Sequence, residues 1–74
     1  MINMDMNYTF KEAIAPSQLT KKTFKFGHSK VWITTWMRDD YKREEWGKVS
    51  ESSVSLYIAT MIINNLKKEG WSII

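Results

Sequence analysis

The spacing of apolar residues changes along this chain, and that change limits the folds it can adopt. In residues 22–37, Phe24 and Phe26 alternate with polar residues, and after Gly27-His28-Ser29 the stretch VWITTWM continues with β-branched and aromatic residues. Alternation with a period of two is typical of strands, and a glycine-containing break between two such runs is typical of a turn. The sequence therefore predicts an antiparallel β-hairpin over residues 22–37.

Two registers are open to this hairpin. Pairing Phe26 with Val31 places Lys25 opposite Trp32. A two-residue Gly27-His28 turn instead places Lys25 opposite Lys30, and like charges directly opposite each other destabilise a strand pair. We therefore favour the pairing of Phe26 with Val31.

Beyond Gly47 the apolar spacing lengthens to that of a helix. Serines precede the pattern, lysines lie in its last turn and Gly70 follows it, which are start and stop signals of a helix. The sequence predicts that the longest helix spans residues 53–69. Its apolar stripe is broad and needs cover on more than one side, either from the sheet or from a second copy in a homodimer. The candidate dimer face consists of Val54, Ile58, Met61, Ile62 and Leu66.

The remaining segments complete an α+β prediction. Thr9 and Glu12 match a capping box ahead of Pro16, which predicts a short N-terminal helix. The charged residues 38–46 are read as a short helix or a solvated loop, and residues 71–74 as a third short strand beside the hairpin. We expect a single domain over residues 1–74, with residues 1–7 a flexible terminus and the hairpin packed on the long helix.

Composition excludes several ways of stabilising so short a chain. It has 74 residues, no cysteine and one histidine, His28, so disulfides and thiolate or histidine zinc sites are not expected. The longest apolar run, residues 57–63, is shorter than the ~20 residues of a membrane span. No segment has the pattern of a secretory signal, and we expect a cytoplasmic protein that does not enter a membrane. The net charge of +3 permits nucleic-acid contact without requiring it.

Catalytic patterns are missing from the sequence. The clustered carboxylates at 39–40 and 44–45 have Lys42 and Arg43 between them, which is typical of a solvated, ion-paired surface. His28 lies in the predicted turn, and no phosphate-binding glycine loop or nucleophile motif accompanies it. The sequence predicts no catalytic residue, no metal site and no cofactor.

Trp32 and Trp36 are the candidate functional residues. If Phe24 and Ile33 face the helix, alternation places both tryptophans on the other face of the hairpin. Three interpretations stay open: the tryptophans are core, they dock another protein, or they stack single-stranded nucleic acid. The candidate partner-binding residues are Trp32, Trp36, Thr34, Lys25, Lys30, Arg38 and Tyr41.

Together these features predict a small non-enzymatic binding protein whose partner is another protein. Its brevity, its lack of catalytic groups and its aromatic content suit a compact inhibitor or regulator of the kind that phages and other mobile elements encode. A single-stranded nucleic-acid-binding module that uses the aromatic and basic face of the hairpin is the alternative. A homo-oligomeric structural protein is the second alternative.

Overall fold

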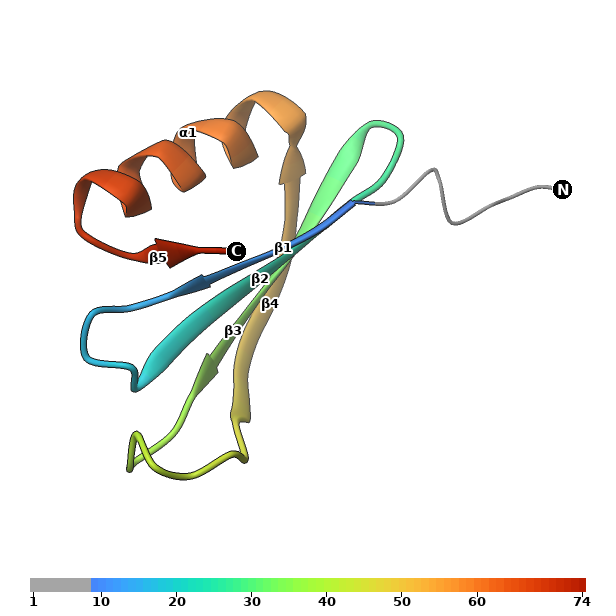
Figure 1. The fold of residues 1–74 in the computed structure, drawn as a ribbon. Coiled ribbons are helices and arrows are strands. Elements are labelled where there is room, and N and C mark those ends of the chain that lie inside the picture. Colours follow the sequence, from blue (N-terminus) through green and yellow to red (C-terminus); the bar gives the residue numbers. More distant parts are fainter. Residues whose placement is uncertain (1–8) are drawn as a thin grey trace, which may run out of the picture.

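A five-stranded antiparallel sheet with one helix on one side forms the fold (Figure 1). The computed structural model describes residues 9–74, and the expectation for residues 1–7 lies outside that range. The strands follow the order β4-β3-β2-β1-β5 across the sheet. The elements are β1 (Thr9–Ile14), β2 (Thr20–Phe26), β3 (Lys30–Met37), β4 (Gly47–Ser55), α1 (Leu56–Lys68) and β5 (Ser72–Ile73). The predicted α+β class is confirmed.

The hairpin is formed by β2 and β3 in the favoured register. Phe26 pairs with Val31 and Lys25 with Trp32. The Gly27 N–H donates to the Lys30 carbonyl at 2.8 Å and closes the turn. The like-charge pair of Lys25 and Lys30 is thereby avoided.

The predicted short N-terminal helix is wrong, because residues 9–14 form β1. This strand pairs along its whole length with β2, from Thr9 opposite Phe26 to Ile14 opposite Lys21. A helix this short forms very few internal hydrogen bonds for the cost of nucleation. Pairing with β2 instead satisfies the backbone and buries Ala13 completely. Tertiary contacts thus override the capping pattern.

The long helix begins three residues later than predicted. Residues 53–55 extend β4 instead, and Ser55 caps α1 by accepting the Ile58 N–H at 3.2 Å. The connection over residues 38–46 contains a turn and no helix, so of the two predicted alternatives the loop is the one observed. Strand β4 itself was not predicted, because its sequence GKVSESSVS is mostly polar and exposed.

The predicted C-terminal strand is present as β5, although it pairs with β1 and not with the hairpin. Gly70, at φ 91°, ends the helix in the left-handed region, and the Trp71 N–H donates to the Leu66 carbonyl at 3.0 Å. Glycine accepts this conformation without steric cost. The chain then returns to place Ile73 opposite Ala13.

The core lies between α1 and one face of the sheet. Its buried members come from three strands and the helix: Ala13, Phe24, Val31, Ile33, Ala59, Ile63 and Leu66. Within residues 9–74, the only helix lies on this side of the sheet, so no helix of the described chain covers the opposite face (Figure 1). We call that opposite side the open face.

Candidate binding groove on the open face of the sheet

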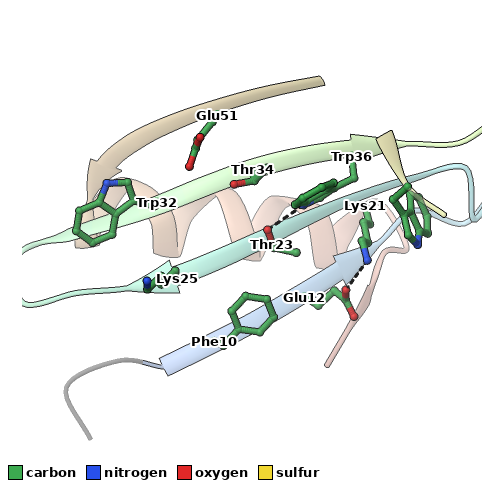
Figure 2. Close-up of a pocket in the computed structure, with 10 residues that line it drawn as sticks. Phe10, Glu12, Lys21, Thr23, Lys25, Trp32, Thr34, Trp36 and Glu51 are labelled. Carbon is green, nitrogen blue, oxygen red and sulfur yellow. Dashed lines mark hydrogen bonds and ion pairs between the residues drawn. The ribbon is translucent and has the colours of Figure 1, made fainter. Parts of the chain in front are cut away.

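A groove of about 480 Å³ lies on the open face, and ten side chains line it (Figure 2). Successive residues of a strand point to opposite faces, so the neighbours of the buried Phe24 and Ile33 lie on this side. The lining residues, called the groove hereafter, are Phe10, Glu12, Lys21, Thr23, Lys25, Trp32, Thr34, Trp36, Trp46 and Glu51.

Strand register arranges the groove in three rows that cross the sheet. The first aromatic row contains Phe10, Lys25 and Trp32, which are direct partners on β1, β2 and β3. The second aromatic row contains Lys21 and its partner Trp36. Between these two rows lies the central row, Glu12, Thr23, Thr34 and Glu51. Neighbouring rows are two residues, or about 6.6 Å, apart along each strand.

Trp36 is fixed against the sheet by a hydrogen bond. Its indole Nε1 donates to the Oγ1 of Thr23 on the neighbouring strand at 3.1 Å (Figure 2). A partly buried indole N–H needs such an acceptor. The sheet is irregular here, because Thr35 pairs with Ser50 and Trp36 with Lys48, which leaves Val49 as a bulge.

Cations contact the rings at this end of the groove. The Nζ of Lys21 lies 4.7 Å from the ring centroid of Trp46 and 5.9 Å from that of Trp36. The same Nζ forms an ion pair with Glu12 at 3.0 Å. The guanidinium carbon of Arg38 lies 4.0 Å from the Trp46 centroid. Cation–π contacts of this kind hold rings in a defined orientation.

Arg38 links two connections to the groove. Its Nε donates to the Gln18 carbonyl at 2.8 Å, and its Nη1 donates to the Arg43 carbonyl. Its backbone N–H donates to the Leu19 carbonyl at 3.0 Å. The Arg38 side chain thus ties the β1–β2 turn to the β3–β4 connection beneath Trp46, and it acts as a positioning residue for that ring.

The other end of the groove is open to solvent. Trp32 is 40% exposed and Phe10 64% exposed. A Cβ at Gly27 would lie 2.7 Å from Cζ3 of Trp32, so the indole packs on the glycine backbone. Lys25 lies between the two rings in the same row (Figure 2). This end combines exposed ring surface with a cation.

The structure brings together most of the predicted partner-binding residues. Trp32, Thr34, Trp36 and Lys25 line the groove, and Arg38 contacts it through Trp46. Lys30 is exposed at the start of β3 and is not part of the lining. Tyr41 is exposed in the β3–β4 connection beside Lys42, also outside the groove.

Sequence reasoning missed six groove residues for three reasons. The capping pattern places Phe10 and Glu12 in a helix. However, Phe10, Glu12 and Ile14 occupy every second position, with the buried Ala13 on the other face, as in a strand. Thr23 lies in the predicted hairpin and Lys21 directly before it, both on the same face as Trp32, so alternation alone could have identified them. Trp46 and Glu51 come from segments whose placement depends on the pairing of β4 with β3.

The candidate dimer face is divided by the fold. Leu66 is buried, and Val54 and Ile62 pack against the core. Ile58 and Met61 remain 41% and 46% exposed. They lie beside two further exposed side chains of α1, Leu56 and Tyr57. The exposed apolar surface of α1 therefore consists of Leu56, Tyr57, Ile58 and Met61 and differs from the candidate dimer face.

Comparison of the chain with family models, with curated proteins and with solved structures found no match. Among residues 9–74, no helix combines the length and apolar character needed to cross a membrane. Nor do the side chains of that part form a group of three or more His, Asp or Glu positioned to hold a metal ion.

Proposed function

We propose that this protein is a non-enzymatic, cytoplasmic binding protein whose groove holds single-stranded nucleic acid. The observation that carries the proposal is the row of Phe10, Lys25 and Trp32, in which a lysine lies between two exposed rings. Exposed aromatic side chains stack bases, and interleaved cations contact the phosphates. The second aromatic row also places a lysine beside a ring, since Lys21 pairs with the half-buried Trp36.

The shape of the site favours a single strand over a duplex. Duplex DNA is read mainly by an element that enters a groove of the helix, whereas the site here is a hollow on a sheet. Helix α1 packs on the other side of the sheet and does not project from the open face. Unpaired bases can lie flat on such a surface because their faces are accessible.

The charges of the groove suggest that stacking supplies most of the affinity. Lys21 is already paired with Glu12 at 3.0 Å, which offsets part of its attraction for phosphate. If Lys21 and Lys25 are the two phosphate contacts, the logarithm of affinity should fall with the logarithm of salt concentration with a slope of about −1.4. A mainly apolar protein interface should depend much less on salt.

Docking to another protein, which the sequence alone favours, is the second candidate. The exposed rings of Trp32 and Phe10 support it, since large aromatics are common anchors at interface centres. In this case the protein acts as an inhibitor or regulator of its partner. Self-association through the exposed residues of α1 is a third proposal. It uses the helix and not the groove, and light scattering tests it.

A binding titration tests the first proposal. Fluorescence anisotropy of a labelled oligothymidine of about 12 nucleotides, a length within known site sizes, should show saturable binding to the full chain. The double variant Phe10→Ala with Trp32→Ala should lose most of the affinity and keep its circular dichroism spectrum. Tyr57→Ala is the matched control, because Tyr57 is a 73% exposed aromatic on α1, away from the groove. Equal binding by the double variant and the parent would contradict the proposal.

A further inference from the structure

We propose that Glu51, next to Thr34 in the groove, gives the groove a preference for guanine in a single strand. This inference rests on the proposed function. The two residues are direct partners on β4 and β3, and they lie in the central row between the two aromatic rows. Bases stacked on the flanking rings point their edges at this row, so its polar groups are placed to read them.

The interactions within the central row leave the side chains of Glu51 and Thr34 available to bind a base. Thr23 accepts the indole N–H of Trp36, and Glu12 is paired with Lys21. Both are therefore committed to interactions inside the groove (Figure 2). Glu51 also forms an ion pair, with Lys48 at 2.8 Å, but the two side chains are 48% and 54% exposed, whereas Glu12 and Lys21 are only 26% and 18% exposed. An ion pair this exposed is weak, so Glu51 stays open to a ligand. Lys48 bonds Oε1 alone, and both carboxylate oxygens keep a lone pair for a further donor.

The chemistry of a carboxylate selects among the bases. An ionised carboxylate only accepts hydrogen bonds, through two oxygens side by side. The base-pairing edge of guanine offers two adjacent donors, N1–H and the N2 amino group, which match those oxygens. Thymine and uracil offer one N–H between two carbonyl oxygens, which repel a carboxylate. Adenine and cytosine offer an amino group next to an acceptor nitrogen, so they fall between these cases.

The negative charge of Glu51 also determines which part of the strand it meets. The ion pair with Lys48 offsets part of this charge, and the remainder repels phosphate, so the backbone of a bound strand should follow the lysines of the aromatic rows. Base edges, which carry no net charge, are left to face the central row. The same carboxylate thereby sets both the orientation of the strand and its base preference.

Three oligonucleotides test this inference on the full chain: oligothymidine, the same strand with one central guanine, and the same strand with inosine in that place. Inosine lacks the N2 amino group and keeps N1–H. The parent protein should bind the guanine strand at least about fivefold more tightly than oligothymidine, the lower end for a bidentate pair. The inosine strand should have an intermediate affinity.

The variant Glu51→Gln should lose the guanine advantage, so that its affinity for the guanine strand falls to its affinity for oligothymidine. Glu69→Gln is the matched control, since it removes the same charge from an exposed position at the end of α1. A parent without guanine preference, or a Glu51→Gln variant that retains it, overturns the inference. If the parent binds none of the three strands, the proposed function itself fails.

Discussion

Trp36 and Thr23 are joined across β2 and β3 by a hydrogen bond of 3.1 Å from the indole N–H to the threonine hydroxyl. Thr23 is the one buried polar residue among residues 9–74, at 9% exposure. The bond therefore satisfies a donor and an acceptor that have little access to water. It also fixes the ring that forms one wall of the groove.

The first prediction removes this acceptor with little change in shape. Thr23→Val should lower the free energy of unfolding by about 1–3 kcal/mol, because the indole N–H is left without its partner. Urea denaturation followed by tryptophan fluorescence measures the loss. Thr60→Val is the control, since the Thr60 hydroxyl is exposed and bonds only the Leu56 carbonyl of its own helix. A Thr23→Val variant as stable as the Thr60→Val variant would show that the bond contributes nothing.

The second prediction concerns the glycine beneath Trp32. In Gly27→Ala, the new Cβ would lie 2.7 Å from the indole, so the ring must move out of its position. We expect the binding of oligothymidine to weaken severalfold while the protein stays folded, because overpacking commonly costs only ~1–3 kcal/mol. Anisotropy titration and circular dichroism measure the two effects.

Gly47→Ala provides the control for that change. A Cβ at Gly47 would lie 3.6 Å from the Met37 carbonyl, an ordinary van der Waals distance. This variant should bind and fold like the parent. Equal binding by both alanine variants would mean that the position of the Trp32 ring does not matter for the ligand.

The third prediction compares two isoleucines of α1. Ile63→Ala should cost about 2–5 kcal/mol, because Ile63 is buried between the helix and the sheet and its truncation leaves a cavity. Ile58→Ala should cost clearly less, since Ile58 is 41% exposed. Thermal or urea unfolding of both variants measures the difference. Equal losses of stability in the two variants would contradict the burial of Ile63 in the core.

The fourth prediction addresses the exposed surface of the helix. Met61 lies at the centre of the apolar stripe that the sequence shows, yet it is 46% exposed. Met61→Asp should therefore leave the melting temperature nearly unchanged, because the carboxylate can remain in water. A large loss of stability in the monomeric protein would contradict this exposure.

Light scattering on the same variant tests self-association. If the parent is a homodimer through α1, its mass should halve in Met61→Asp, since a charge at a two-fold interface meets its own copy. An unchanged mass at equal concentration would exclude this face as the dimer contact. The readout is independent of the proposed nucleic-acid binding, which would use the opposite side of the sheet.

Local pattern was sufficient to predict the hairpin and its register. The two-residue period of Phe24, Phe26, Val31 and Ile33 assigns these side chains to one face and sends Trp32 and Trp36 to the other. Charge repulsion between Lys25 and Lys30 then selects the register. The helix and its glycine stop follow from spacing in the same way, because α1 contains its own backbone hydrogen bonds.

Tertiary structure decided the elements whose stability depends on a neighbour. Residues 9–14 fit a helix turn or a strand by sequence, and they become β1 because β2 and β5 flank them. Strand β4 is mostly polar and has no regular apolar alternation, so its pairing with β3 defines it. The groove is completed by the same cause: the hairpin register already pairs Lys25 with Trp32, but Phe10 joins their row only because β1 pairs with β2.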